Sequence, residues 1–580
     1  MYSQGVKKTI VTRQVAKKSN SLGDIHPVLE RVFLSRDLTS AADLDRSFAK
    51  LPSPWLLSNM QTMVNHLITA FLQQQRITVV ADFDADGATS CALAIKGLQL
   101  LGLQQVRFVV PNRFEYAYGL TPELVELVKL QQPDIILTVD NGISSIEGVD
   151  AANALGIKVL ITDHHLPGKQ LPAAAAIVNP ALVGDEFPSK AIAGVGTMFY
   201  VLLALRSRLR EIAWFTEQRP EPNLASLLDY VALGTVADVV ALDAVNRILV
   251  HHGLLRIRAG AAQPGINALI AVAGKSPHTI QASDLGFALG PRLNAAGRMD
   301  DMSLGIQCLL ATDLITAKKM ADQLDALNND RKEVEGQMKQ EAQHLISEMK
   351  MLDGKQALAG VCLYEANWHQ GVIGILASRI KDQLHRPVIA FASAGKDLIK
   401  GSARSIPGVH IRDVLADIAI AQPKLLYMFG GHAMAAGLTI AMHDYPAFAL
   451  LFDAMVKKRL AQVDLAQKLL VDGELSEHDM NIEFADMLQN ACVWGQGCPE
   501  PVFSGQFEVV QVKIVGQRHL KLLLRKLNGD LLIDAIAFFI DKPEHWQGMR
   551  ACTAVYTLNI NEFRGNRSLQ LMVQYMEKTL

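Results

Sequence analysis

The sequence predicts an α/β protein in four successive parts: a doubly wound parallel sheet, a long connecting helix, a second α/β region and a small C-terminal β-barrel. Three patterns carry this prediction. Short β-branched runs alternate with helical runs between residues 55 and 161, an unbroken helical pattern covers 315–349, and five strand patterns with little helix occupy 507–576. A length of 580 residues also suits several domains.

The first part contains four predicted strands, at 77–81, 106–110, 135–139 and 158–161. Helical patterns lie before and between them, at 55–74, 89–101, 121–130 and 146–155. Strands separated by helices of this length form parallel sheets with helices on both faces. The apolar stretch at 191–205 is shorter than the roughly 20 residues of a membrane span, so we expect a buried helix there and no membrane association.

The long helical pattern repeats apolar residues at three- and four-residue steps, without proline. At 1.5 Å per residue it spans roughly 50 Å, which favours a connection between domains, although a surface helix of a bundle would show the same pattern. A second α/β region follows at 357–460, with strands at 359–363 and 387–391 and a glycine-rich turn at 429–437. The five final strands, at 507–515, 519–526, 531–539, 551–559 and 568–576, are typical of an OB-fold barrel.

These patterns divide the chain into five segments. Residues 1–50 form a leader that packs on the core, 51–310 the first α/β domain, 311–352 the connecting helix, 353–462 the second α/β domain and 463–580 the OB-fold domain. The leader has no apolar core of the kind a signal peptide requires.

Composition narrows the function classes. The net charge of −2 argues against a protein that coats duplexes without selectivity, but it allows a local basic groove. The six cysteines are scattered and contain no CxxC pair, which argues against a zinc ribbon or a disulfide framework. We therefore expect a reducing, cytoplasmic location.

Acidic and histidine residues follow the predicted strands of the first domain. The strand at 77–81 leads to Asp82, Asp84 and Asp86, that at 135–139 to Asp140, and that at 158–161 to Asp163, His164 and His165; a weaker fourth case is the apolar run 231–239, which contains Asp238. Ligands bind beyond the carboxyl ends of parallel strands, so these side chains should converge. Crowded carboxylates repel one another unless cations are present.

The mixture of carboxylates and imidazoles without thiolates favours Mn²⁺ or Mg²⁺, and there are enough ligands for two ions. Two such ions about 3.5–4 Å apart catalyse the hydrolysis of phosphate esters. Each segment alone has a plainer explanation: the first loop could bind calcium or be a solvated turn, and a single aspartate after a strand could cap a helix. The ordered succession of all four segments favours the metal site.

The same four segments resemble, in order, the motifs of the DHH phosphoesterase family, whose name describes the triplet Asp163–His165. The likeness covers nearly the whole chain and extends to the branch of exonucleases specific for single-stranded DNA. Gly290–Arg298 resembles the connector motif of that branch, and Gly401–Ser405 and Gly430–Gly437 resemble the two signatures of its second domain. This chain departs from the family at Val80, where a histidine is common, and at Cys498, where asparagine is expected.

The resemblance implies a metal-dependent 5′→3′ exonuclease that releases mononucleotides from single-stranded DNA, in recombination, mismatch repair and other DNA repair. It implies the catalytic residues Asp84, Asp86, Asp140, His164, His165 and Asp238. It implies that these residues hold two Mn²⁺ or Mg²⁺ ions together with Asp82, which replaces the histidine missing at Val80. Asp163 would orient a histidine instead of binding metal.

Substrate choice must come from residues outside the metal ligands. The candidates for the 5′-phosphate and the DNA are Arg113, Phe114, Arg292, Asn294, Arg298, Ser402, Arg404, Gly431 and His432. Arginine binds phosphate oxygens with two parallel hydrogen bonds, and Phe114, Tyr116 and Tyr118 could stack on unpaired bases. Surface ion pairing by the arginines, packing of the aromatic rings against the core and a structural role for His432 are the plainer alternatives.

The resemblance also implies partners and leaves rival functions open. Single-strand-binding protein and a helicase are the expected partners of a monomeric enzyme, and the barrel could bind either DNA or a protein. The first rival is a DHH phosphoesterase of small molecules, such as cyclic dinucleotides, short oligonucleotides or pyrophosphate, which would need neither the chain length nor the barrel. A non-catalytic scaffold would have lost the acidic residues, and an aminoacyl-tRNA editing protein would carry a synthetase module.

Overall fold

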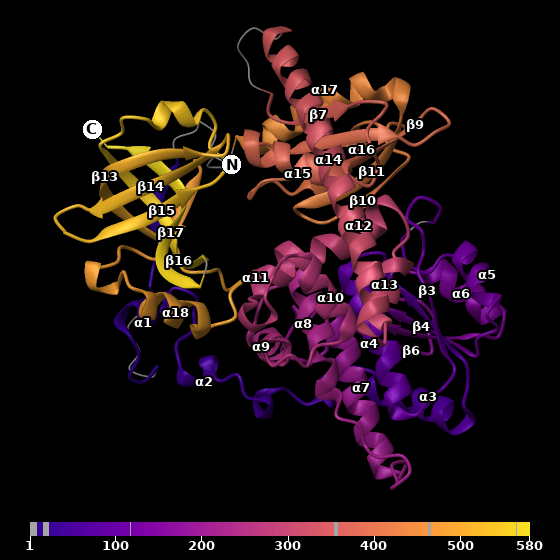
Figure 1. Cartoon of the computed structure of the whole chain (residues 1–580). Helices are drawn as coiled ribbons and strands as arrows, with labels where there is room; N and C mark the ends of the chain where they lie inside the picture. Colours follow the sequence, from indigo (N-terminus) through magenta and orange to yellow (C-terminus); the bar gives the residue numbers. More distant parts are fainter. Residues whose placement is uncertain are drawn as a thin grey trace. The chain divides into compact units, whose positions relative to one another are not determined.

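The computed structural model describes residues 8–15, 22–116, 118–352, 358–461, 466–563 and 565–579. These residues form two compact units (Figure 1). Unit 1 comprises residues up to Thr12, Asn329–His478 and the segment from Val502 onward, and unit 2 comprises Arg13–Asn328 and Asp479–Pro501. The division falls within helix α14 (Leu314–Leu352), which confirms the predicted connecting helix.

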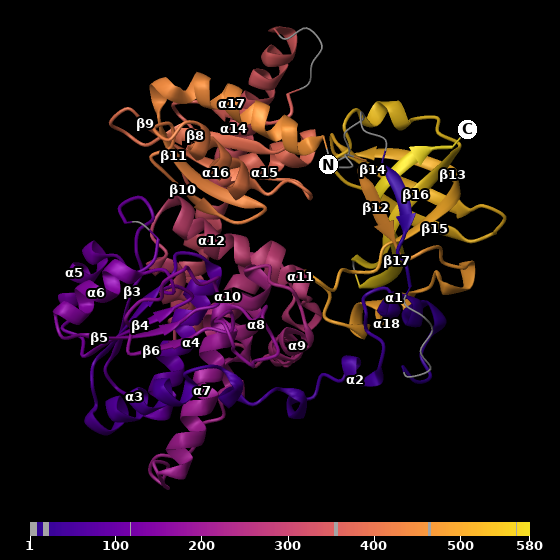
Figure 2. The same cartoon turned by 180° about the vertical axis from the view of Figure 1, so that it is seen from behind.

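A five-stranded parallel sheet forms the centre of unit 2. Its strand order is β3 (Val106–Val109), β2 (Ile77–Ala81), β4 (Ile135–Val139), β5 (Lys158–Thr162) and β6 (Ala176–Val178). Helices α3 (Met60–Gln73), α4 (Ala85–Leu101) and α7 (Gly194–Glu211) pack on one face, and α5 (Pro122–Lys129) and α6 (Ile146–Ala154) pack on the other (Figures 1 and 2). The predicted doubly wound sheet is thus confirmed.

Two predicted elements of unit 2 were wrong in detail. Helix α4 begins at Ala85, four residues early, because the Asp84 carboxylate accepts hydrogen bonds from the N–H groups of Asp86 (2.9 Å) and Gly87 (3.0 Å). The run 231–239 is no strand: it belongs to helix α8 (Leu228–Ala237). This helix is buried on nearly all sides, and an apolar run without a polar stripe does not distinguish a buried helix from a strand.

Unit 2 contains further helices that pack mainly on other helices. They are α1 (Pro27–Leu34), α2 (Ala41–Leu44), α9 (Ala244–Arg258), α10 (Pro264–Val272), α11 (Ala282–Asp284), α12 (Gly290–Met299), α13 (Ser303–Leu310) and α18 (Ile482–Ala491). Within the predicted leader, residues 22–50 pack in unit 2, where the rings of His26 and Phe484 lie 4.5 Å apart. Strand β1 (Thr9–Thr12) belongs to unit 1, and residues 1–7 and 16–21 lie outside the described residues.

Unit 1 contains a mixed five-stranded sheet and a closed barrel. The sheet order is β10 (Met428–Gly431), β11 (Ala435–Ala441), β9 (Leu398–Arg404), β8 (Val388–Ser393) and β7 (Val361–Tyr364). Helices α15 (Ile373–Leu384), α16 (Ile411–Ala421) and α17 (Tyr445–Leu460) pack around it. The second α/β region is confirmed, while its predicted limits, residues 353 and 462, lie outside the described residues.

The barrel confirms the predicted OB-type region. It closes in the order β13 (Phe503–Val515), β14 (His519–Lys526), β15 (Leu532–Ala537), β17 (Asn566–Lys578) and β16 (Ala551–Phe563) (Figure 2). Strand β1 pairs in parallel with β12 (Lys468–Val471) beside it, so the start of the described chain joins this unit. Among the described residues, none of the helices has the length and apolar character needed to cross a membrane.

Candidate metal centre

The register of the parallel sheet brings three loops of unit 2 to one edge. Ala81 of β2 pairs with Val139 of β4, and Val139 pairs with Thr162 of β5. The next residues along the three strands are Asp82, Asp140 and Asp163, which therefore emerge side by side. Polar groups at the carboxyl edge of a parallel sheet occupy the usual ligand position of such folds.

The loop after β2 contributes three aspartates with different surroundings. Asp82 is 6% exposed and Asp86 is 1% exposed. Asp86 Oδ2 accepts a hydrogen bond from the Gly194 N–H (2.7 Å) and Oδ1 accepts one from the Val195 N–H (3.0 Å), so its carboxylate caps the start of α7. The Asp84 carboxylate caps α4, as described above. Two helix N-termini thus hold this loop rigidly in place.

Asp140 follows β4 in a strained conformation. Its φ is +61°, a left-handed value that an ordinary residue adopts at a cost of order 1–3 kcal/mol. Asn141 holds the turn, since its side-chain amide donates to the carbonyl oxygens of Val80 (3.0 Å) and Val139 (2.9 Å). Gly194 packs on the Asp140 carboxylate so closely that a Cβ there would lie 2.6 Å from the Asp140 Cβ. The backbone strain therefore directs this carboxylate into the crowded edge.

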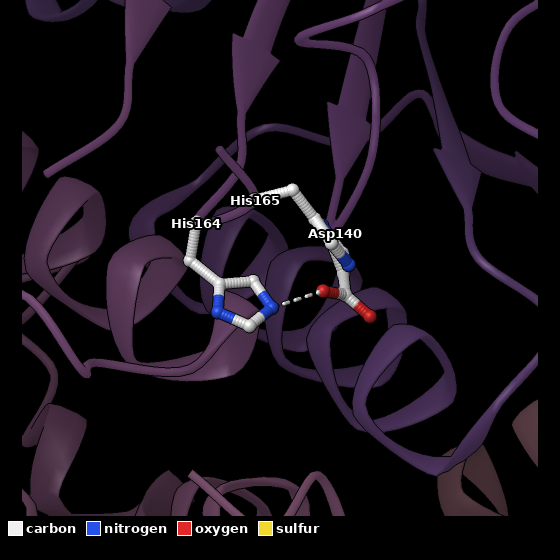
Figure 3. Close-up of side chains that lie close together, drawn as sticks. All are labelled: Asp140, His164 and His165. Atoms are coloured by element: carbon white, nitrogen blue, oxygen red, sulfur yellow. Dashed lines mark ion pairs between the residues drawn. The ribbon is translucent and has the colours of Figure 1, made fainter. Parts of the chain in front are cut away.

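The two histidines that follow β5 lie close to these aspartates. His164 Nε2 lies 3.0 Å from Asp140 Oδ1, 3.6 Å from Asp238 Oδ2 and 3.9 Å from Asp86 Oδ2. Figure 3 shows the His164 ring directing this nitrogen toward the Asp140 carboxylate, with His165 beside them. His165 is held differently: its Nδ1 lies 2.7 Å from Asp163 Oδ1. Asp163 Oδ1 also accepts hydrogen bonds from the N–H groups of His164 and His165.

Asp238 reaches the same cluster from the end of helix α8. It caps the C-terminus of that helix, and its side chain is 21% exposed. The next residue, Val239, has a φ of +63°, which is rare for a β-branched residue. A carboxylate at a helix C-terminus faces the negative end of the helix dipole, which is unfavourable unless a cation is near.

The seven predicted metal ligands all lie together. Three overlapping groups bring one ligand atom per residue within 4.8 Å of one another: Asp140, His164 and His165; Asp86, His164 and Asp238; Asp82, Asp84 and Asp140. Position 80 offers no ligand, because Val80 is fully buried in the apolar core. Asp82, two residues later, belongs to the third group.

The electrostatics of the cluster favour cations. Burial raises the pKa values of Asp82, Asp86 and Asp140 well above the ordinary range, and the neighbouring carboxylates raise them further. Burial and the Asp84 charge raise the pKa of Asp238 to about 7. These shifts mean that the cluster resists carrying its full negative charge without a compensating positive charge.

The pKa values of the two histidines are shifted in opposite directions. Burial, followed by the effect of His165, lowers the pKa of His164 to about 4, which leaves it as the neutral imidazole that binds metals. Burial alone would lower the pKa of His165, but the hydrogen bond and charge of Asp163 raise it to about 9. Asp163 therefore fixes the orientation of His165, the arrangement expected of a residue that supports a ligand.

The donor set fits divalent metal ions. Asp140 Oδ1 and His164 Nε2 are buried and face each other, yet neither completes a hydrogen bond among the described residues. Carboxylate and imidazole donors, with no thiolate in the three groups, suit Mn²⁺ and Mg²⁺. The first group shares His164 with the second and Asp140 with the third, and the three groups together provide enough donors for two ions.

Arg113 lies beside the first acidic loop, where it was expected to bind phosphate. Its guanidinium lies 4.2 Å from the ring centroid of Phe83, and its Nε is buried with no hydrogen-bond partner in the described part of the chain. Burial lowers the pKa of Arg113, while Asp82 and Asp84 partly offset this effect. Phe114, which follows it, is 41% exposed.

The residues that we singled out on α12 have structural contacts that the sequence did not reveal. Arg292 forms an ion pair with Asp325 (2.7 Å) and donates to the Ala288 carbonyl oxygen (2.7 Å). Asn294 Oδ1 accepts a hydrogen bond from the Ala85 N–H (2.9 Å) and so braces the start of α4. Arg298 is half-buried in the last turn of the same helix. At least two of the three therefore help to hold the acidic loop and the helices around it.

Tyr118 also touches the cluster, although we expected only base stacking from it. Its hydroxyl donates to the Asp140 carbonyl oxygen (3.3 Å) and lies 3.4 Å from His165 Nδ1. Gly194 and Val195, which hold Asp86, were not predicted either. Their backbone N–H groups leave no signal in a sequence, because 108 residues separate Asp86 from Gly194.

The four predicted residues of unit 1 form a separate group. Ser402 and Arg404 share one face of β9, and Arg404 Nη1 donates to Ser402 Oγ (3.1 Å). Both side chains pack against Gly374 in the first turn of α15, where a Cβ would lie 2.9 Å from Arg404 Nη2. Gly431, with a φ of +141°, and His432 form the turn between β10 and β11, and β11 pairs Ala435 with Arg404.

This second group has the properties of an anion site. Arg404 is half-buried, and no carboxylate among the described residues pairs with it. The N–H groups in the first turn of α15 carry partial positive charge, and the cap residue Val372 offers no side-chain acceptor. A guanidinium, a hydroxyl and a helix N-terminus together are suited to a phosphate group.

Comparison with known proteins identifies all three regions. Sequence profiles of protein families match at residues 76–235 (DHH family, N-terminal domain), 354–458 (DHHA1 domain) and 471–575 (RecJ OB domain). The chain is 50% identical over 566 residues to the single-stranded-DNA-specific exonuclease RecJ of Salmonella typhimurium, covering 97% of each chain. It is 49% identical over 567 residues to RecJ of Escherichia coli, again covering 97% of each chain.

Solved structures give the same result. The crystal structure of RecJ from Thermus thermophilus in complex with Mn²⁺ is 28% identical in sequence, with a TM-score of 0.78. The match covers 96% of this chain and 76% of the other. The Mg²⁺ complex of the same protein matches with a TM-score of 0.73 and 26% identity, covering 96% and 75% of the two chains.

Proposed function

The chain belongs to the RecJ exonucleases of the DHH family, and from this premise we infer how its residues degrade single-stranded DNA. The activity is that of a single-stranded-DNA-specific exonuclease, a hydrolase of phosphodiester bonds that acts in DNA repair, with Mn²⁺ or Mg²⁺ as its cofactor. The single observation that carries the mechanism is the convergence of seven carboxylate and imidazole ligands at the carboxyl edge of the sheet in unit 2.

We assign the metal ligands to Asp82, Asp84, Asp86, Asp140, His164, His165 and Asp238. When bound, two divalent ions supply Lewis acidity to the attacking water and the phosphodiester. The protein holds the donors in place beforehand: Gly194 and Val195 fix Asp86, the strained backbone fixes Asp140, and Asp163 fixes His165. His164 stays neutral because burial lowers its pKa, so it can present a lone pair without first losing a proton.

We assign the 5′-phosphate to the anion site on β9 and α15. A terminal phosphate carries more negative charge than an internal phosphodiester, so a half-buried arginine without a carboxylate partner would select the strand end. Such an anchor sets 5′→3′ polarity, because it accepts only the 5′ end of a strand, and digestion from that end releases mononucleotides. Ser402, Gly431 and His432 would contact the same phosphate, and Arg113 and Phe114 the nucleotides near the metals.

The test is digestion of a single strand labelled at either end, beside its duplex, with Mn²⁺, with Mg²⁺ and with chelator. We expect metal-dependent loss of the single strand from its 5′ end and little loss of the duplex. Cleavage of small phosphodiesters without cleavage of DNA would contradict the proposal and favour a small-molecule phosphoesterase.

The anchor has its own test. Arg404→Ala should raise KM for 5′-phosphorylated strands by about tenfold, as loss of a charge-assisted bond predicts, and should change KM for 5′-hydroxyl strands much less. Arg412→Ala, which removes an exposed arginine on α16 in the same unit, is the matched control. Equal losses on both kinds of strand end would remove Arg404 from this role.

We further propose a monomeric enzyme of a reducing, cytoplasmic compartment, with single-strand-binding protein and a helicase as partners. All six cysteines are free and buried, including Cys492 and Cys498, whose sulfur atoms lie 3.7 Å apart. Light scattering of the purified protein, alone and with single-strand-binding protein, checks the oligomeric state and this partner.

A further inference from the structure

The turn before α12 exposes a large aromatic side chain. Phe287 is 87% exposed, and no Phe, Tyr or Trp among the described residues is more so. It lies in a π-helical turn, Leu285–Leu289, in which the Gly290 N–H bonds to the Leu285 carbonyl oxygen five residues earlier. Single π-helical turns are uncommon and occur often at functional sites.

The sequence explains the turn. Pro291 has no N–H group, and its ring crowds the carbonyl four residues earlier, which is that of Phe287. The helix widens to accommodate the ring, and Arg292 then stabilises the widened turn by donating to the Ala288 carbonyl oxygen (2.7 Å). The ion pair of Arg292 with Asp325 holds the guanidinium in this position. Phe287 is therefore presented to solvent by a braced segment.

This segment and the helix that follows it pack against residues next to metal ligands in the chain. A Cβ on Gly286 would lie 3.2 Å from Val236, and one on Gly290 would lie 3.1 Å from Ala237, the last residue of α8 before Asp238. Farther along, Asn294 holds the Ala85 N–H, and Gly297 packs against the Phe83 carbonyl oxygen. Phe287 thus lies beside the end of α8 that carries a metal ligand.

A second exposed apolar side chain follows the same end of α8. Val239 directly follows Asp238, is 63% exposed and has the strained φ of +63°. Isolated apolar side chains on a surface are common, and exposure of Phe287 alone would mean little. Two of them in segments at the C-terminal end of α8, one on a π-helical turn and one on a strained backbone, indicate a surface that contacts a ligand.

We propose that Phe287 stacks on an unpaired nucleobase of the strand that enters the metal centre, with Val239 beside the same strand. The proposal rests on the function proposed above and adds a base-contacting residue to it. A single strand offers free base faces, and an aromatic ring binds them without regard to sequence. A duplex hides those faces within its own stack, so this contact favours single strands.

The experiment compares Phe287→Ala and Phe287→Trp with the unmodified protein. The substrates are an unstructured oligonucleotide, the same oligonucleotide with abasic residues near its 5′ end, and thymidine 5′-p-nitrophenyl phosphate, a small phosphodiester. We expect Phe287→Ala to raise KM for the normal oligonucleotide by about tenfold, the size of one lost stacking contact. Phe287→Trp should restore KM, and cleavage of the small phosphodiester should not change.

Abasic positions provide the decisive comparison. Where the contacted base is missing, the unmodified protein should show the raised KM, and Phe287→Ala should add nothing further. Leu72→Ala is the matched control, because Leu72 is 62% exposed on α3, just before the amino end of β2 and so at the opposite edge of the sheet.

Three outcomes would overturn the proposal. Phe287→Ala could leave KM for the oligonucleotide unchanged, or it could lower cleavage of the oligonucleotide and of the small phosphodiester equally, which would show a structural role. If the unmodified protein cleaved the small phosphodiester but no oligonucleotide, the proposed function itself would fail, and the base contact with it.

Discussion

The two ends of helix α8 each carry an aspartate, and the two carboxylates have opposite surroundings. Asp229, in the first turn, is fully buried, and its oxygens accept hydrogen bonds from the N–H groups of Gln263 (2.6 Å) and Tyr230 (3.1 Å). Arg256 Nε lies 3.9 Å away. Asp238, at the other end, is close to Asp84, Asp86 and Asp140, and the nearest nitrogen among its ion pairs is that of neutral His164.

Burial alone does not decide whether an aspartate of α8 binds metal. Asp229 lies at the positive end of the helix dipole, and hydrogen-bond donors and Arg256 within the fold offset part of the cost of burying its negative charge. Asp238 lies at the negative end, among like charges, and the charge of His165 only partly offsets the rise of its pKa, so we expect a bound cation to complete the compensation. An acidic residue in a buried helix is therefore a ligand candidate when its surroundings leave it uncompensated, and a structural residue when they do not.

The largest effect should separate the two ends by activity. Asp238→Asn should lower the rate of single-strand digestion about a thousandfold, because a metal ligand contributes several kcal/mol of transition-state stabilisation. Asp229→Asn should stay within a few-fold of the unmodified protein. Digestion rates and metal content per chain measure both. Full activity of the Asp238 variant with normal metal content would show that Asp238 is no ligand.

A smaller effect should follow from the residue that positions His165. Asp163→Asn should weaken metal affinity by about 10- to 100-fold, the usual size for a hydrogen-bond partner of a ligand. The readout is the Mn²⁺ concentration for half-maximal activity, and saturating Mn²⁺ should restore most of the rate. Asp150→Asn, at an exposed position on α6, is the control. A lower rate at every Mn²⁺ concentration, with unchanged metal affinity, would point to a catalytic role instead.

The sequence alone could not predict most of the difference between Asp229 and Asp238. The strands and the residues after them were predictable, because β-branched runs fix the strands and parallel strands present their carboxyl ends together. Asp82, Asp140 and Asp163 follow directly from that rule. The setting of Asp238 was not predictable: its run is apolar on every side, so the helix looked like a strand.

The sequence also could not predict contacts between segments that are far apart in the chain. The sequence singled out Asp238 because it closes an apolar run and matches the order of the family motifs. The donors around Asp229 come from Gln263 and Arg256, far along the chain, and left no such signal. The arginine at position 292 matched a phosphate-binding pattern, yet its ion pair with Asp325 depends on where α14 begins to pack. Local patterns specify residue types, whereas compensation of charge is a property of the folded unit.

At Asp229 we expect a pH-dependent contribution to stability. Burial raises the pKa of Asp229 from 3.8 to about 6, although hydrogen bonds and Arg256 partly offset it. Because the pKa of Asp229 is higher in the folded protein than in the unfolded chain, its protonated carboxyl group stabilises the folded state. This stabilisation is complete below about pH 4 and is lost as the pH rises through about 6. Asp229→Asn leaves one backbone N–H without an acceptor, which costs about 1–3 kcal/mol. The loss of stability caused by Asp229→Asn should be larger below about pH 4 than above about pH 6.

Thermal unfolding across this pH range measures the effect, with Asp150→Asn again as the control. A difference between Asp229→Asn and the unmodified protein that did not change with pH would contradict the assignment of the raised pKa to Asp229. A variant more stable than the unmodified protein at every pH would show that the two backbone N–H groups do not depend on this carboxylate.

The smallest effect should have the opposite sign, and it tests the comparison most directly. In the presence of chelator, Asp238→Asn should stabilise the protein, by on the order of 1 kcal/mol, because it removes one of several buried like charges. With Mn²⁺ the unmodified protein should gain more stability than the variant, since an ion that binds only the folded state shifts unfolding by mass action. Thermal unfolding of both proteins, with chelator and with Mn²⁺, measures the stability difference between them and the stability that each gains from Mn²⁺. If Asp238→Asn instead destabilised the metal-free protein as Asp229→Asn does, both ends of α8 would be structural, and the argument from uncompensated charge would fail at this residue.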